Sequence, residues 1–166
     1  MIGVGGLGHL AIQFAAKMGC EVVVFSSTES KKEEAMKLGA SQFVATKGKA
    51  ELDIGKQIGH LIVTTSMPPD WNMFLPIMAP SGVIYPLTVN EGKLEMPYRA
   101  MTRKELRIQG SVVAPRQVHR EMIEFAGLHG IKPIIEEFPM SVEGITVAME
   151  RLKEGKMRYR AVLVAN

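Results

Sequence analysis

Short apolar runs alternate with amphipathic stretches along the first two thirds of the chain. Residues 22–25 form a continuous apolar run, which is typical of a parallel strand buried on both faces. Further strands are predicted at 42–44, 61–65, 82–87 and 106–113. Helices are predicted at 9–18 and at about 31–38, each ending at a glycine. This alternation indicates βαβ units and therefore an α/β protein with a mostly parallel sheet.

The helix at about 31–38 is predicted to begin after an N-cap at Ser30, with Glu33 in the capping-box position.

Two segments that follow this helix, 45–59 and 70–79, have less regular patterns. Residues 45–59 are too polar and too often interrupted by glycine for a helix to be predicted. Prolines lie in or beside 70–79, so only a short or kinked helix is expected there.

The pattern changes after about residue 115. Two longer amphipathic helices are predicted, separated by an extended segment at 132–140 and followed by a last strand at 160–164. The second helix has Ser141 as its N-cap. We expect the apolar stripes of both helices to face the core; they comprise Val118, Met122, Phe125 and Ala126 in the first, and Ile145, Ala148, Met149 and Leu152 in the second. The chain is accordingly divided into a domain at 1–115 and a C-terminal segment at 116–166.

Composition narrows the class of protein. With 166 residues, of which 46% are hydrophobic and 22% charged, the chain can form one sizeable core. The net charge of +3 comes from dispersed basic residues without interleaved aromatic side chains, so no nucleic-acid partner is predicted. Neither a membrane span nor a secretion signal is recognisable, and a cytoplasmic location is expected.

Few residues are candidates for metal or nucleophilic chemistry. The single cysteine, Cys20, excludes an internal disulfide, and the four histidines do not have the spacing of metal ligands. No G-x-S-x-G nucleophile motif is present. His9 begins a predicted helix, where packing or a hydrogen bond at the helix N-terminus is favoured over catalysis. The sequence therefore predicts neither a catalytic residue nor a metal site in this chain.

The clearest motif is a G-x-G-x-x-G turn formed by Gly3, Gly5, Gly6, Leu7 and Gly8 with Val4 between the first two glycines. The three motif glycines permit a tight turn, a close approach to a pyrophosphate and close packing of helix on strand. The N-terminus of the following helix favours an anion through its free N–H groups. This motif predicts a doubly wound, dinucleotide-binding sheet of the Rossmann type.

Only two residues precede this glycine turn, which truncates the first strand of the predicted sheet. That central strand must be missing, shortened or supplied by another chain. A missing strand would leave an exposed edge beside the glycine turn, and such an edge invites association.

Hydroxyl groups rather than a carboxylate follow the strand at 22–25. In this fold the end of the second strand lies beside the adenosine ribose, where an NAD site uses Asp or Glu. Ser26, Ser27 and Thr28 can donate to a 2'-phosphate, and Lys31 can supply a positive charge. This favours NADP(H). Two alternatives stay open: the segment is an ordinary loop with a solvated lysine, or Glu29 accepts from the ribose of NAD(H).

Several segments in order resemble the zinc-dependent medium-chain alcohol dehydrogenases, most closely their cinnamyl alcohol dehydrogenase-like branch. They are GVGGLGHLAIQFAAKMG, VVVFSSTESKKEEAMKLGA, GVIYPLTV, RKELRIQGSVVAPRQ and RLKEGKMRYRAVLV. The resemblance extends over essentially the whole chain. It implies the coenzyme-binding portion of an NADP(H)-dependent enzyme that interconverts alcohols and aldehydes.

The same resemblance implies roles for particular positions. Gly5, Gly6, Leu7 and Gly8 would face the pyrophosphate, and Arg160 would reach a coenzyme phosphate. Ser26, Ser27, Thr28 and Lys31 would hold the 2'-phosphate. Thr64 and Thr65 would lie on the adenosine side, and the nicotinamide side would be lined by Leu87, Ser111, Val112 and Val113.

The resembled family's zinc-binding catalytic region has no counterpart in these 166 residues. Zinc is therefore expected only in a full-length protein, and this chain alone is expected to be inactive. An alcohol or aldehyde would be a partner only together with a catalytic half, and a homo-oligomer is compatible with the sequence. The alternatives are a non-catalytic NADP(H)-binding or interaction module and, more weakly, a methyltransferase-like domain.

Overall fold

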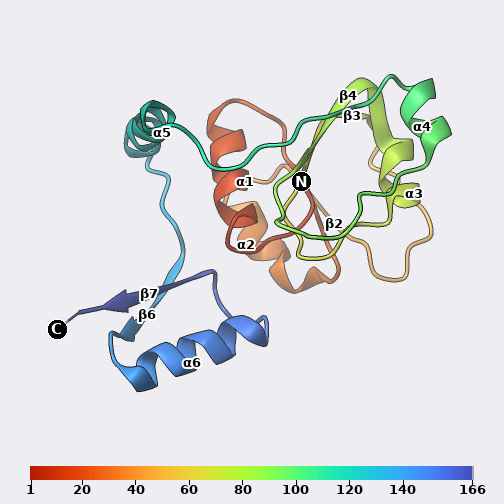
Figure 1. Cartoon of the computed structure of the whole chain (residues 1–166). Coiled ribbons are helices and arrows are strands. Elements are labelled where there is room, and N and C mark those ends of the chain that lie inside the picture. Colours follow the sequence, from red (N-terminus) through yellow and green to blue (C-terminus); the bar gives the residue numbers. More distant parts are fainter. Residues whose placement is uncertain (166) are drawn as a thin grey trace.

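The computed structural model describes residues 1–165, and its main body is an open parallel sheet with helices on both faces (Figure 1). The strands are β1 (Val23–Ser26), β2 (Gln42–Ala45), β3 (Ile58–Val63), β4 (Met78–Pro86) and β5 (Arg107–Ile108). β1 pairs with β2, while β4 pairs with both β3 and β5, and every pairing is parallel. The predicted α/β sheet is thus confirmed.

The start of the chain fills the centre of this sheet. Ile2 forms parallel bridges to Phe25 of β1 and to Val63 of β3. Its N–H donates to the carbonyl of Ile62 at 2.8 Å, and its carbonyl accepts from Thr64 at 3.0 Å. The resulting order, β2-β1-Ile2-β3-β4-β5, is that of a Rossmann sheet. The central strand is therefore shortened and not missing.

Successive residues of β1 supply two separate cores, as expected for a strand covered on both faces. Val24 packs in one cluster with Ile12 of α1 (Gly8–Lys17) and Ala35 of α2 (Lys32–Lys37). Phe25 packs in the other cluster with Phe74 of α3 (Trp71–Phe74), the two rings meeting edge to face at 5.3 Å. This second cluster also includes the short 3₁₀ helix η2 (Leu75–Ile77), while α4 (Tyr98–Arg103), which was not predicted, packs against it.

The start of the second predicted helix differs from expectation. A 3₁₀ turn, η1 (Glu29–Lys31), precedes α2, and Ser30 does not cap α2. The Ser30 hydroxyl instead bonds the hydroxyl of Thr28 at 2.9 Å, and Glu33 pairs with Lys37 along the helix. The capping prediction was wrong because the turn η1 places Ser30 inside a helical segment, where its side chain cannot reach a free N–H.

The last predicted strand of the main sheet is also shorter than expected. β5 covers only residues 107–108, although the Gln109 N–H still donates to the carbonyl of Ile84. Its neighbour β4 ends at Pro86, and the next N–H, that of Leu87, donates to β3 instead. Residues 110–113 consequently have no strand to pair with, and the predicted strand at 106–113 was too long.

The C-terminal segment lies to one side of the main sheet (Figure 1). It comprises α5 (Arg116–His129), β6 (Ile135–Pro139), α6 (Val142–Lys153) and β7 (Arg160–Val164). β6 and β7 pair in parallel, so the expected extended segment is itself a strand. As predicted, the Ser141 side chain caps α6 by accepting from the N–H of Gly144.

The apolar stripes of α5 and α6 are only partly buried and do not face a core along their whole length, as was predicted. α5 has no buried residue, and Val118 and Met122 are 47% and 44% exposed. In α6 only Gly144 and Ala148 are buried. The prediction failed only in part: Phe125 stacks on Phe14 of α1 with 6.0 Å between the ring centroids and Ala148 is buried, whereas Ile145, Met149 and Leu152 stay exposed. Among residues 1–165, no helix has the length and apolar character needed to cross a membrane.

Candidate functional site

A cleft of about 590 Å³ opens at the carboxyl ends of the central strands. Parallel strands all end at one edge of the sheet, so the loops after Ile2, β1 and β3 meet there. Its lining includes the predicted residues Gly3, Gly5, Gly6, Ser26, Ser27, Lys31, Thr64 and Thr65. The glycine turn and the end of β1, which are about 20 residues apart in sequence, thus form one site, as expected for this fold.

The glycine turn is held tightly against the neighbouring strands. Gly3 has a φ of +94°, a conformation that favours glycine, and its N–H donates to the carbonyl of Phe25 at 2.9 Å. The Thr64 hydroxyl lies 2.9 Å from the Ile2 carbonyl and 3.2 Å from that of Gly3. A Cβ on Gly8 would lie 2.2 Å from the Gly3 carbonyl oxygen. The helix α1 can begin here only because Gly8 has no side chain.

Backbone donors at the start of α1 are free to bind an anion. The N–H groups of Gly5, Gly6, Leu7 and Gly8 donate to no other residue within the described part of the chain. A Cβ on Gly5 would meet no atom within 4 Å, so this residue faces open space. Free N–H groups at the positive end of a ten-residue helix are the usual setting for a bound phosphate.

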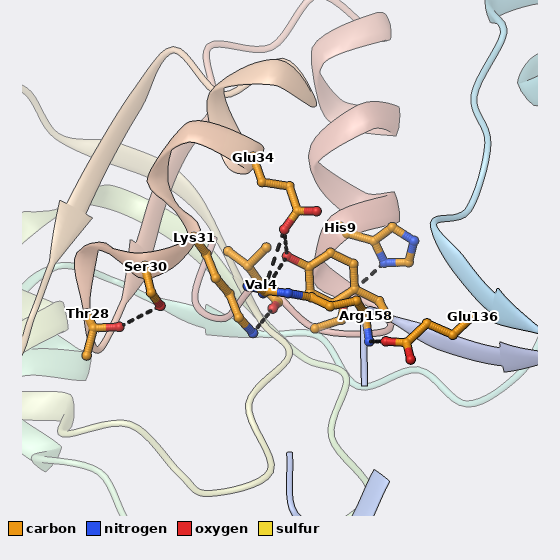
Figure 2. Close-up of polar contacts among 10 residues, drawn as sticks. Val4, His9, Thr28, Ser30, Lys31, Glu34, Glu136 and Arg158 are labelled. Carbon is orange, nitrogen blue, oxygen red and sulfur yellow. Dashed lines mark hydrogen bonds and ion pairs between the residues drawn. The ribbon is translucent and has the colours of Figure 1, made fainter. Parts of the chain in front are cut away.

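Two cations lie beside these donors. The Lys31 ammonium donates to the carbonyl of Val4 at 2.6 Å, and burial lowers the pKa of Lys31 (Figure 2). The Arg160 guanidinium lies 3.2 Å from the position of a Cβ on Gly6. Neither side chain forms an ion pair with a carboxylate among residues 1–165. The only acidic side chain in the lining, Asp70, caps α3.

His9 supports the glycine turn from beneath. Its side chain is fully buried, with Nδ1 2.9 Å from the carbonyl of Gly5 and Nε2 3.1 Å from the N–H of Ile134. These partners require a neutral ring that donates from Nδ1 and accepts at Nε2. Burial, the largest cause, also lowers the pKa of His9 and favours this neutral form. His9 is therefore a packing residue that ties the turn to the C-terminal segment.

Other predicted residues lie outside the lining of the cleft. Thr28 lies in the loop after β1, where it bonds Ser30, and Leu87 follows the end of β4. Leu7 and Gly8 contribute backbone atoms at the start of α1. The candidates at the nicotinamide side follow β5 and are exposed: Ser111, Val112 and Val113.

The structure adds residues that sequence reasoning missed. The loop at 66–70 lines the cleft directly after Thr64 and Thr65, and its position after a parallel strand could have indicated this. The C-terminal segment also reaches the cleft through Leu152, Gly155, Met157 and Tyr159. For Tyr159 the only indication in the sequence is its position next to Arg160.

The described residues do not fit a metal ion. Residues 1–165 contain no group of three or more His, Cys, Asp or Glu side chains that could hold one.

Comparison with known proteins gives the site its context. The profile of the family described as zinc-binding dehydrogenase matches residues 6–127. The chain belongs to this family. It is also 35% identical over 98% of its length to an aldehyde reductase, AdhA, from Synechocystis sp..

Solved structures of relatives confirm both the fold and the branch of the family. A cinnamyl alcohol dehydrogenase from Sorghum bicolor matches 98% of this chain with a TM-score of 0.87 and 32% identity. CAD from Helicobacter pylori, solved in complex with NADP(H), matches 98% with a TM-score of 0.83 and 26% identity. The predicted Rossmann fold and the predicted resemblance to the cinnamyl alcohol dehydrogenase-like branch are therefore confirmed.

The chain spans about half the length of the relatives that it matches. It covers 48% of the Synechocystis reductase, and 46% of both the Sorghum and the Helicobacter chains. The similarity therefore concerns the part of each relative that corresponds to the glycine turn and the cleft of this chain.

Proposed function

We propose that this chain is the coenzyme-binding portion of an NADP(H)-dependent alcohol dehydrogenase or aldehyde reductase. The observation that carries the proposal is the position of Lys31, which lies across the glycine turn in a cleft that also contains Ser26 and Ser27. The NADP(H) complex of the similar Helicobacter pylori protein supports the same coenzyme.

The residues present fit the phosphates of this coenzyme. The free N–H groups at the start of α1, together with Arg160, would hold the pyrophosphate. Lys31, Ser26, Ser27 and Thr28 would hold the 2'-phosphate. An ammonium has three N–H donors, so Lys31 can keep its bond to Val4 and still donate to a phosphate oxygen.

Contacts of Glu29 favour NADP(H) over NAD(H). An NAD site needs a carboxylate at the end of the second strand to accept from the ribose hydroxyls. Glu29 is the nearest candidate, but it pairs with Lys32 at 3.2 Å and does not line the cleft. Its side chain is 60% exposed.

The remaining coenzyme contacts belong to the proposal as well. Thr64 and Thr65 would lie on the adenosine side. The nicotinamide side would be formed by Leu87, Ser111, Val112 and Val113. The last three are exposed, and the bound nicotinamide ring or a catalytic region would cover them. The bound coenzyme would supply the hydride, while the chain itself binds and orients it.

Turnover by this chain alone is not expected. In the resembled alcohol dehydrogenases zinc would act as a Lewis acid on the substrate oxygen, and residues 1–165 contain no group of three or more His, Cys, Asp or Glu side chains that could hold a metal ion. A catalytic half, a substrate and homo-oligomer contacts would complete the enzyme, which we expect to act in the cytoplasm.

The chain alone should bind NADPH without oxidising it when aldehydes are added, as followed by absorbance at the nicotinamide band. Aldehyde-dependent loss of that absorbance would contradict this part of the proposal.

The coenzyme preference can be tested by titrating NADPH and NADH into the full chain and into Lys31→Glu. We expect the unmodified chain to prefer NADPH, since Lys31 pairs with the additional phosphate. Lys31→Glu should weaken NADPH binding by about 30-fold, because a charge-assisted hydrogen bond is replaced by repulsion. NADH binding should not weaken.

The matched control is Lys32→Glu, which makes the same change of charge at the adjacent, exposed position. It should change NADPH affinity by less than about threefold, since exposed charges are screened. Tighter binding of NADH than of NADPH by the unmodified chain would refute the 2'-phosphate assignment. Equal losses in the two variants would do the same.

A further inference from the structure

Lys31 and Glu34 lie three residues apart at the start of α2, yet they do not pair. Side chains at this spacing are neighbours on a helix, and opposite charges there normally attract. The Glu34 carboxylate instead accepts a hydrogen bond from the Tyr159 hydroxyl and lies 3.7 Å from Nη1 of Arg158. Figure 2 shows Glu34 directed toward Arg158, while Lys31 points to the carbonyl of Val4.

Tyr159 is rigidly held in this position. It is only 4% exposed, and its ring stacks on that of His9 with 4.8 Å between the centroids. Its N–H donates to the carbonyl of Ile134 at 3.1 Å. Burial raises the pKa of the Tyr159 hydroxyl, so this group keeps its proton and remains a donor to Glu34.

The same ring lies next to the Lys31 ammonium. The Lys31 nitrogen is 5.2 Å from the centre of the Tyr159 ring, a distance at which a cation is attracted to an aromatic face. Tyr159 thus contacts both Lys31 and Glu34, the two opposite charges that do not pair with each other. It holds the carboxylate through its hydroxyl and attracts the ammonium through its ring.

We propose that Tyr159 is a specificity-determining positioning residue, which binds Glu34 so that Lys31 stays available for the 2'-phosphate of the coenzyme. This inference rests on the proposed function. Without the Tyr159 hydroxyl, the Glu34 carboxylate would be held only by its 3.7 Å contact with Arg158, and it would turn toward Lys31 and partly neutralise it. The carboxylate would also lie closer to the 2'-phosphate and repel it, as the acidic residue of an NAD site does.

The experiment compares dissociation constants of NADPH and NADH for the full chain, Tyr159→Phe, Glu34→Gln and the double variant. Tyr159→Phe keeps the ring and its stacking, and should weaken NADPH binding about fivefold while NADH binding changes less than twofold. Glu34→Gln should tighten NADPH binding modestly, because the competing carboxylate is gone. In the double variant the loss caused by Tyr159→Phe should disappear, since there is no carboxylate left to release.

Two matched controls separate this role from general effects. Tyr85→Phe removes another tyrosine hydroxyl, one that bonds His60 at 3.1 Å outside the cleft, and Glu33→Gln removes the neighbouring exposed carboxylate. Neither should alter the ratio of the two affinities. Thermal unfolding of each variant checks that it is folded, and Glu34→Gln tests the inference even where Tyr159→Phe is unstable.

The outcomes are distinguishable. Parallel weakening of NADPH and NADH in Tyr159→Phe would show a purely structural role and overturn the inference. An unchanged affinity ratio in Tyr159→Phe, a loss of NADPH binding in Glu34→Gln, or no rescue in the double variant would also overturn it. If the unmodified chain bound neither coenzyme or preferred NADH, the proposed function itself would fail, and this inference with it.

Discussion

Replacing Gly8 by alanine is expected to destabilise the chain severely, lowering the free energy of unfolding by about 4 kcal/mol or more. The new Cβ would lie 2.2 Å from the Gly3 carbonyl oxygen, far inside van der Waals contact. Gly3 cannot retreat without losing its bond to Phe25 and the contact of its carbonyl with Thr64. Urea unfolding followed by circular dichroism measures the change.

Two other glycines serve as controls for this substitution. Gly5→Ala adds a methyl group with no atom within 4 Å, so it should leave stability within about 1 kcal/mol. It should still weaken coenzyme binding, because the methyl group projects into the phosphate site. Gly127→Ala lies in the exposed helix α5 and should raise stability by up to about 1 kcal/mol. Similar unfolding midpoints for Gly8→Ala and Gly5→Ala would contradict the steric argument.

Lowering the pH from 8 to 5 is expected to destabilise this polypeptide when Met1 carries a free amino group. The Met1 nitrogen is buried in the sheet and donates to the carbonyl of Val23 at 2.8 Å. Burial lowers the pKa of this amine from 8.0 to about 5. Because the unfolded chain binds the proton more tightly, stability is full above pH 8 and is lost as the pH falls toward 5. The loss is about 4 kcal/mol.

The control for the pH experiment is the same chain with an acetylated N-terminus. The acetylated nitrogen keeps one N–H for Val23 and cannot be charged, so this loss of stability should vanish. His9, whose pKa is also lowered, would still contribute in the same direction as the pH falls below 6.5, its ordinary pKa. Urea unfolding at pH 8, 6.5 and 5 distinguishes the two forms. Identical pH dependence for both would show that the amine is not the group responsible.

Much of the main body could be predicted because its determinants are local. The apolar run ending in Phe25 is typical of a strand covered on both faces, and two cores indeed meet at β1. The glycine spacing from Gly3 to Gly8 reflects close backbone approach, which the structure shows directly. Ser26, Ser27 and Lys31 were placed together by the general geometry of parallel sheets, and they line one cleft.

What could not be predicted depends on tertiary partners. The periodicity of α5 shows an apolar face, but not whether another element covers it, and here Val118 and Met122 stay exposed. The length of β5 depends on where its neighbour β4 ends. The contact between Glu34 and Tyr159 joins positions 125 residues apart, so no local pattern could indicate it.

The bridging position of Ile2 has a consequence for how binding and folding depend on each other. Among the described residues, Ile2 alone forms β-bridges to both β1 and β3, so the backbone pairing between the two halves of the sheet is confined to a short seam. The glycine turn begins at the end of this seam, immediately after Ile2. A dinucleotide bound there would favour the joined state over a separated one, and by thermodynamic linkage each tenfold excess over its dissociation constant adds about 1.4 kcal/mol to the stability of the assembled sheet.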